Sequence, residues 1–169
     1  MPIPLSCYWE PSKAAHLMAL ALKEVGKPYL LGSEGPVDLM LATWDCSELV
    51  QHLLACVGVR QVTADDGTMT PIERFDGAGF QWAHCHQISL EDAIDTPGAL
   101  LFIRNGQTYP DKPHHIGHVA ISLGNGMFVE ARGRAYGVVM GLVRASFNRG
   151  GKVRELYTPA LVRIPEAKR

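Results

Sequence analysis

The sequence has few cysteines and no long hydrophobic run. Its four cysteines stand at positions 7, 46, 56 and 85 of 169 residues, too few and too irregularly spaced for a disulfide scaffold. We therefore expect free thiols, formed in a reducing compartment. No apolar stretch approaches the roughly 20 residues that a membrane span requires, so membrane insertion is not expected.

The sequence also lacks an excess of charge of either sign. Its formal net charge is -1, from 16 basic and 17 acidic residues. A nucleic-acid partner is not expected, because such binding neutralises many phosphates. The opening "MPIPLSCYWEPSK" has neither a basic start nor an apolar centre, so no secretory signal is expected and release by another route would follow synthesis in the cytoplasm.

The remaining composition is that of a folded protein, with 47% hydrophobic and 20% charged residues. The length suits a single domain over residues 1–169.

Hydrophobic periodicity predicts helices first and strands afterwards. One helix is expected from an N-cap at Ser12 to a stop at Gly26, and a second over residues 46–57. Residues 60–95 show no clear period, and "DDG" and "FDGAG" within them are typical of loops. Short strands are expected at 98–104, 118–123, 127–133, 137–143 and 158–164. This order predicts an α+β fold, with N-terminal helices packed on one side of a central antiparallel β-sheet.

Cys46 stands where the second helix should begin. Asp45 as N-cap and Glu48 three residues later form a capping-box pattern, which places Cys46 at the first helical position. Unpaired backbone amides and the helix dipole favour a thiolate there, and the amides can hold an oxyanion. A buried core cysteine is the alternative, since free cysteine is among the most buried residue types. Cys56, near the helix end among apolar residues, fits that second role.

A histidine hairpin is the second chemical feature, in "HHIGHVAISLGNGMFVEARG". Strand alternation places His118, Ala120 and Ser122 on one face, where the small residues leave room for a neighbouring helix. His114 and His115, in the preceding proline-rich loop, are weaker candidates for catalysis.

The turn of this hairpin decides whether Glu130 joins His118. A two-residue Asn-Gly turn pairs Gly124 with Met127 and sends Glu130 to the opposite face. A three-residue loop, 124–126, instead places Glu130 diagonal to His118, as a triad requires. The alternative for Glu130 is an exposed charge paired with Arg132 or Arg134.

Four segments, in order, resemble one family, the NlpC-type papain-like cysteine peptidases. "GKPYLLG" is similar to their Gly-x-Pro-Tyr-x-x-Gly entry, and "DCSELV" to their Asp-Cys-Ser-Gly-Leu-Val nucleophile motif. "TPGALLFI" resembles their Pro-Gly-Asp-Leu strand, and "GHVAISLGNGMFVEA" their histidine hairpin. The resemblance covers roughly residues 14–142.

The resemblance implies a papain-like fold and hydrolysis of an amide in the stem peptide of bacterial peptidoglycan, often after γ-linked D-glutamate. It makes Cys46 the nucleophile, His118 the general base and acid, and Glu130 the residue that orients His118. Tyr29 matches a motif tyrosine near the nucleophile, where it could contact the oxyanion. It implies no cofactor, and we expect a monomer.

Three positions depart from the family pattern. Glu48 replaces a glycine, and we expect its side chain to narrow the site, with Asp45 and Ser47 as further candidate substrate contacts. Ala99 replaces an aspartate, which should remove only a surface or turn contact. Glu130 stands where histidine is commonest, and an acidic residue there resembles certain phage lysins. An injected effector and a virion-borne hydrolase stay open beside the phage lysin.

Other functions remain open from the sequence. An acyltransferase would use the same triad with a different acceptor, and a non-catalytic phage component could use this fold to hold cell wall. In "WAHCHQ", strand alternation would put His84 and His86 on one face, as in a zinc site. A second ligand pair at a suitable spacing is missing, so we expect no metal and a loop near the cleft.

Overall fold

A computed structural model describes residues 12–29 and 44–157. The strand predicted at 158–164 lies outside these residues, as does part of the "GKPYLLG" segment. The helices are α1 (Lys13–Glu24), α2 (Cys46–Cys56), α3 (Ala78–His84) and α4 (Leu90–Asp95). The strands are β1 (Gln61–Thr63), β2 (Met69–Pro71), β3 (His86–Ile88), β4 (Leu100–Arg104), β5 (Ile116–Gly124), β6 (Met127–Ala131), β7 (Val138–Leu142) and β8 (Arg149–Lys152). Short 3₁₀ turns are η3 (Ile72–Arg74), η4 (Pro113–His115) and η5 (Arg154–Leu156).

The two N-terminal helices begin where their caps predict. The Ser12 hydroxyl accepts a hydrogen bond from the Ala15 amide at the start of α1, and Asp45 caps α2. Positive φ angles at Gly26 and Gly58 follow the two helix ends, a conformation that glycine adopts without strain. Among the described residues, no helix has the length and apolar character needed to cross a membrane.

A six-stranded antiparallel sheet forms the centre of the fold, in the order β3-β8-β4-β5-β6-β7. Its β4-β5-β6-β7 portion is the predicted meander. β8 escaped prediction because Gly150 and Gly151 interrupt its hydrophobic pattern. A Cβ at Gly150 would lie 2.7 Å from the Ala93 Cβ, and one at Gly151 would lie 2.5 Å from the Cys85 sulfur. These glycines therefore allow neighbouring elements to approach the sheet closely.

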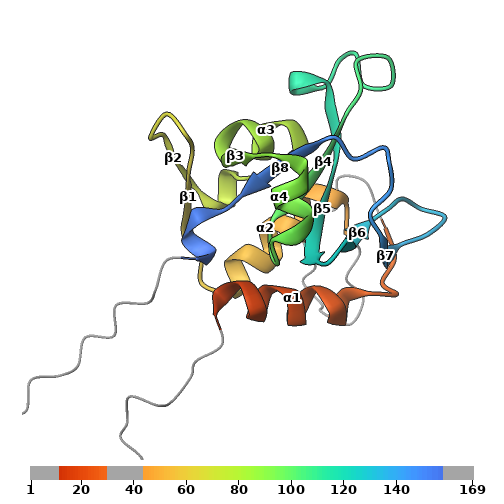
Figure 1. The fold of residues 1–169 in the computed structure, drawn as a ribbon, viewed down its shortest axis with the longest axis horizontal. Coiled ribbons are helices and arrows are strands. Elements are labelled where there is room, and N and C mark those ends of the chain that lie inside the picture. Colours follow the sequence, from red (N-terminus) through yellow and green to blue (C-terminus); the bar gives the residue numbers. More distant parts are fainter. Residues whose placement is uncertain (1–11, 30–43, 158–169) are drawn as a thin grey trace, which may run out of the picture.

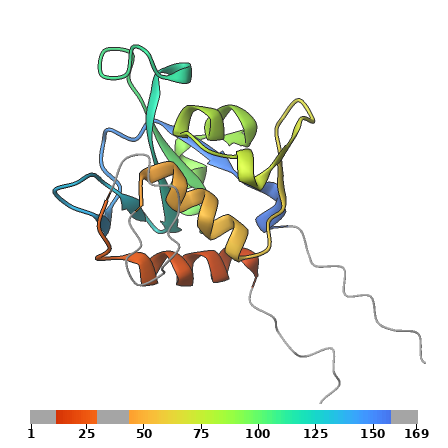
Figure 2. The same ribbon diagram turned by 180° about the vertical axis from the view of Figure 1, so that it is seen from behind.

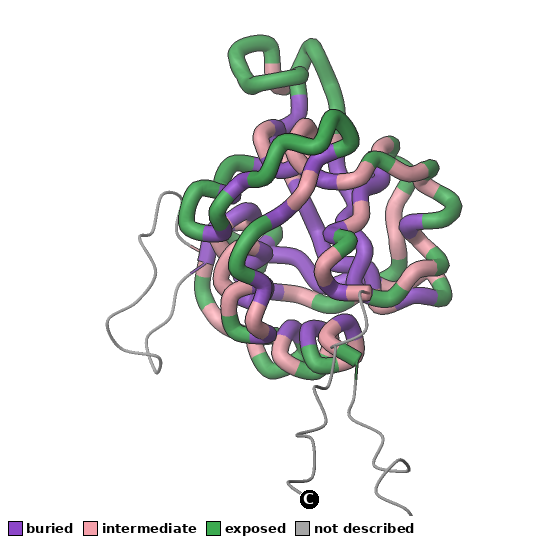
Figure 3. The backbone as a smooth tube through the Cα atoms, turned by 90° about the vertical axis from the view of Figure 1, so that its left-hand side faces the viewer, coloured by how far each residue is buried: buried purple, intermediate pink, exposed green. Residues whose placement is uncertain are grey.

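Helices cover both faces of this sheet, as the two opposite views show (Figures 1 and 2). The larger core joins α1 and α2 to one face of β4 and β5, through residues such as Leu17, Leu53 and Ile121. A smaller core joins α4 to the other face, through Ala93, Ala120 and Phe147 among others. The central strands are accordingly buried, while the outer turns are exposed (Figure 3).

The N-terminal helices α1 and α2 pack on one side of the sheet, as predicted. The other side is covered by α4, which was not predicted because its six residues are too few for a clear helical period. One expectation about the packing was wrong. Ala99 is fully buried in the smaller core and is no surface or turn position.

The β5–β6 hairpin combines a short turn with a bulge. Gly124 pairs with Met127 across a two-residue Asn125-Gly126 turn, so the predicted three-residue loop was wrong. Both turn residues have positive φ, 53° and 76°, which an Asn-Gly pair favours. The register then shifts between Ser122 and Gly124, where Leu123 is the extra residue of a bulge. Farther along, Ile121 pairs with Val129, and this register returns Glu130 to the His118 face.

Candidate active site

The capping box predicted at the start of α2 is present. The Asp45 carboxylate accepts a hydrogen bond from the Glu48 amide at 2.8 Å, and the Glu48 carboxylate accepts one from the Asp45 amide at 3.4 Å. Ser47 donates its hydroxyl to Asp45 at 3.2 Å and to Asp76 at 2.8 Å. Cys46 is therefore the first residue of the helix, partly exposed, on a turn that several hydrogen bonds hold.

His118 lies between Cys46 and Glu130. Its Nε2 is 2.5 Å from Oε2 of Glu130, and the Cys46 side chain lies close enough to raise the pKa of the imidazole. Since Nε2 faces the carboxylate, Nδ1 is the ring nitrogen left for the sulfur. The Glu130 side chain is fully buried and that of His118 is 12% exposed. The structure thus brings together the three residues predicted to form a triad.

The surroundings of His118 favour its protonated form. Burial by itself lowers the pKa of this imidazole, because it disfavours the charged ring. Hydrogen bonds and negative charge from Cys46 and Glu130 outweigh that effect and raise the pKa from 6.5 to about 9. An imidazolium at neutral pH stabilises a thiolate beside it, as a cysteine nucleophile requires.

Glu130 has a partner that the sequence did not reveal. Arg144, from the segment after β7, places its two terminal nitrogens 2.5 and 2.9 Å from Oε1 and Oε2 of Glu130. The predicted partner Arg132 is only a distant contact, at 3.8 Å from Oε1. Although burial raises the pKa of Glu130, its hydrogen bonds with His118 and Arg144 lower it below the usual value. The carboxylate is consequently held ionised inside the protein.

A cavity of about 310 Å³ opens beside the Cys46 sulfur. Its walls come from the starts of α2 and α3 and from the segment before β5; they include Tyr29, Asp45, Ser47, Asp76, Gly79, Phe80, Lys112, Pro113 and Gly117. Burial, and then the negative charge of Cys46, raises the pKa of the Tyr29 phenol to about 12. Tyr29 therefore stays protonated as a hydrogen-bond donor near the sulfur, in the region where the sequence placed it.

Two glycines let the segment 109–113 lie against this cavity. A Cβ at Gly79 would lie 2.3 Å from the Pro113 carbonyl oxygen, and one at Gly117 would lie 2.3 Å from the Tyr109 ring. The fully buried Gln81 links α3 to the start of α2. Its Nε2 donates hydrogen bonds to the carbonyl oxygens of Ser47 and Phe75, both at 2.9 Å. Sequence patterns gave no signal for these contacts, because each joins segments far apart in the chain.

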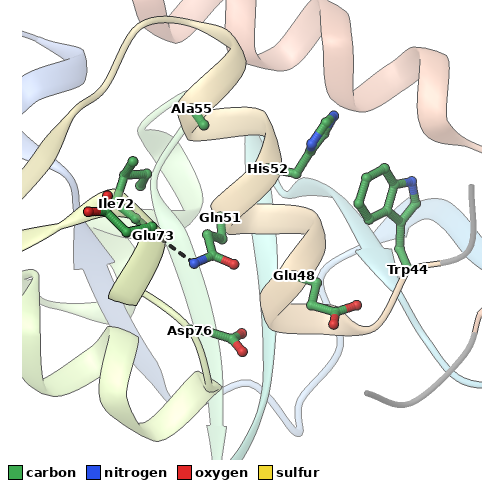
Figure 4. A pocket seen from close by; sticks show the side chains of 8 residues that line it. All are labelled: Trp44, Glu48, Gln51, His52, Ala55, Ile72, Glu73 and Asp76. Atoms are coloured by element: carbon green, nitrogen blue, oxygen red, sulfur yellow. Dashed lines mark hydrogen bonds between the residues drawn. The ribbon is translucent and has the colours of Figure 1, made fainter. Parts of the chain in front are cut away.

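A second hollow, of about 420 Å³, lies farther along α2 (Figure 4). Glu48, Gln51 and His52 line it from the helix, and Glu73 and Asp76 line it from the facing segment. Glu48 thus contributes to this neighbouring hollow, whereas Asp76 borders both spaces. Substrate contact by Asp45, Ser47 and Glu48 remains a prediction.

The other histidines lie apart from this arrangement. His84 ends α3, where it stacks on Phe80, while His86 belongs to β3 and pairs with Asp65 at 2.6 Å. The loop expected at "WAHCHQ" was wrong, because α3 ends and β3 begins inside this segment. Within the described residues, no three His, Cys, Asp or Glu side chains are grouped as a metal site would require. His114 and His115 are exposed, both with positive φ.

The remaining described cysteines differ from each other in environment. Cys85 is buried, which raises the pKa of its thiol to about 12 and leaves it protonated. Cys56 is exposed beside His52, so its expected place in the core was wrong. Burial of part of its side chain nevertheless raises the pKa of the Cys56 thiol.

The chain is similar to known proteins over most of its length. The profile of the NlpC/P60 family matches residues 26–154. The peptidoglycan hydrolase RipB from Mycobacterium tuberculosis is 26% identical with a TM-score of 0.60; the match covers 83% of this chain and 64% of that structure. The NlpC/p60 domain of peptidoglycan hydrolase SagA is 26% identical with a TM-score of 0.55, covering 82% and 97%. The P60 domain of antigen MAP1204 from M. avium subspecies paratuberculosis is 24% identical with a TM-score of 0.57, covering 83% and 94%. A comparison with curated protein sequences found no match.

Proposed function

Because the chain belongs to the NlpC/P60 family, we propose that it is a cysteine peptidase that hydrolyses an amide bond in the peptidoglycan stem peptide, next to γ-D-glutamate. The observation that carries the proposal is the line of Cys46, His118 and Glu130 beside an open cavity. Two similar structures, RipB and SagA, are described as peptidoglycan hydrolases. The chain spans 64% of the RipB structure.

The proposed first step forms a thioester on Cys46. The thiolate sulfur attacks the amide carbonyl carbon, and the carbonyl π-electrons move to its oxygen. We assign the hydrogen bonds to that oxyanion to backbone amides at the start of α2 and to the hydroxyl of Tyr29, which lines the same cavity as Cys46. As the tetrahedral intermediate collapses, the C–N bond breaks and the leaving amine takes the proton from Nδ1 of His118.

The second step releases the product. His118, now neutral, removes a proton from a water molecule, whose oxygen attacks the thioester carbonyl. The C–S bond breaks, a carboxylic acid leaves, and the thiolate–imidazolium pair is restored. Glu130 accepts a hydrogen bond from Nε2 throughout, which fixes the ring orientation and stabilises each imidazolium that forms.

Digestion of purified peptidoglycan tests this proposal. We expect the wild type to release fragments with new peptide termini, identified by mass spectrometry, and Cys46→Ala to release none. Cys56→Ala is the matched control, because Cys56 is exposed at the other end of α2. Folded wild-type protein that leaves walls of several bacteria intact would contradict a hydrolase.

The same assay separates the alternatives from the sequence. Products carrying an added amine in place of the hydrolytic carboxylate would indicate acyl transfer. Binding to peptidoglycan without cleavage, and without labelling of Cys46 by a thiol reagent, would indicate a non-catalytic wall-binding component.

A further inference from the structure

Glu130 is bound on both of its oxygens, although a triad uses only one. Oε2 contacts His118 and one terminal nitrogen of Arg144, while Oε1 contacts the other terminal nitrogen of Arg144. The two contacts from Arg144, 2.5 and 2.9 Å long, form the two-pronged geometry that a planar guanidinium makes with a carboxylate.

A carboxylate in this position requires such a partner. Glu130 has no exposed side-chain area, and an isolated buried charge is strongly disfavoured. A single contact with His118 would also leave the carboxylate free to rotate about its bond to Cγ. Two parallel contacts from Arg144 fix the carboxylate plane and keep Oε2 directed at Nε2.

Arg144 is itself held in place by aromatic rings. Its guanidinium carbon lies 4.8 Å from the centre of the Phe147 ring and 5.5 Å from that of Phe128. Phe147 also lies 6.0 Å, between ring centres, from His118. Arg132, by contrast, is 41% exposed in its side chain and lies over Tyr136, so it does not duplicate Arg144.

We propose that Arg144 is a positioning residue for catalysis, which orients Glu130 toward His118 and keeps its carboxylate charged. The inference rests on the proposed cysteine-peptidase function, and it adds a fourth residue, from the segment after β7, to the predicted triad. Arg144 acts through Glu130 and has no assigned contact with substrate.

Loss of Arg144 should change the pH dependence of the reaction in one direction. Arg144 lowers the pKa of Glu130, so its removal raises that pKa. Protonated Glu130 no longer carries the charge that stabilises the imidazolium, and activity is then lost at a higher pH on the acid side. A residue that only stabilised the fold would lower the melting temperature and leave this acid limb in place.

The test compares Arg144→Met, Arg144→Lys and Arg132→Gln with the wild type. Hydrolysis of a soluble stem peptide is measured against pH, and so is alkylation of Cys46 by iodoacetamide, followed by mass spectrometry of the Cys46 peptide. For Arg144→Met we expect kcat to fall by roughly 10- to 100-fold with little change in KM. Its acid limb should move up by about one pH unit in both assays.

The other two variants separate charge from geometry. Arg144→Lys keeps a cation but loses the planar fork, so its acid limb should stay near that of the wild type while kcat falls. Arg132→Gln should match the wild type in both assays. If Arg144→Met folds poorly, Arg144→Lys alone decides: unchanged kcat in that variant overturns the inference.

Two results distinguish this inference from the proposed function. An unchanged acid limb in Arg144→Met, with wild-type hydrolysis intact, overturns the role of Arg144 and leaves the peptidase proposal standing. A shifted alkylation profile without peptide cleavage by any variant supports the role of Arg144 and overturns the proposed substrate.

Discussion

The raised pKa of His118 predicts a specific dependence of protein stability on pH. The imidazole has a pKa of 6.5 in an unfolded chain and about 9 in the folded protein. A group whose pKa rises on folding contributes stability that is fully present below pH 6.5 and is lost as the pH rises through 9. The difference of about 2.5 pKa units, from 6.5 to 9, corresponds to about 3 kcal/mol.

Urea denaturation measures this contribution when the wild type is compared with His118→Gln at several pH values. Titrating groups that do not contact His118 are common to both proteins and cancel in the difference. We expect the stability advantage of the wild type to be about 3 kcal/mol larger at pH 6 than at pH 9.5. In a Cys46→Ala background the change should be smaller, because one partner of the imidazolium is gone. A stability difference that stays constant over this range would refute the charged pair.

Two further predictions concern the walls of the site. Gly79→Ala should destabilise the protein by about 1–3 kcal/mol and lower kcat/KM, because its Cβ would press on the Pro113 carbonyl oxygen. Gly141→Ala is the control, because a Cβ there would make only ordinary contacts with Phe128. Stabilisation by Gly79→Ala, as alanine usually gives in a helix, would contradict the close contact. Asp45→Ala should lower the free energy of unfolding by about 1 kcal/mol, measured by urea denaturation, and should slow the alkylation of Cys46. Asp45→Asn should restore most of the stability and most of the alkylation rate. Equal effects of the two variants would show that loss of the helix cap is not the cause.

Local patterns predicted the nucleophile turn because its capping contacts are local. Asp45, Cys46 and Glu48 are neighbours in the chain, and the capping box depends only on their spacing. The meander β4 to β7 was predictable for a similar reason, since its strands follow one another along the chain and pair with their neighbours. β3 and β8 lie far apart in the sequence, and a glycine-rich strand carries no alternation to detect.

The placement of Glu130 shows why a correct site can follow from an incorrect turn. A triad was expected to need a three-residue loop, whereas the protein makes a two-residue turn and inserts Leu123 as a bulge. Both solutions add one residue to the β5 side of the hairpin, and one residue is what moves Glu130 onto the His118 face. The need to bring Glu130 next to His118 therefore determined which face of the sheet the Glu130 side chain occupies. It did not determine the type of turn.

Arg144 could not be predicted in the same way, because its distance from Glu130 in the chain reflects no repeating pattern. The two residues are joined only when β7 and the segment after it fold back over β6. A buried glutamate nevertheless implies a nearby cation, since its charge must be balanced. Arg132, which is near Glu130 in the chain, reaches its carboxylate only at 3.8 Å, whereas Arg144 contacts both carboxylate oxygens. If Arg144 holds Glu130 as proposed, then an acidic third residue and an arginine after β7 form one unit, and replacing Glu130 by histidine should require loss of Arg144. Double substitution tests this: Glu130→His should recover more kcat when combined with Arg144→Met than alone, because a cation beside an imidazole opposes its protonation.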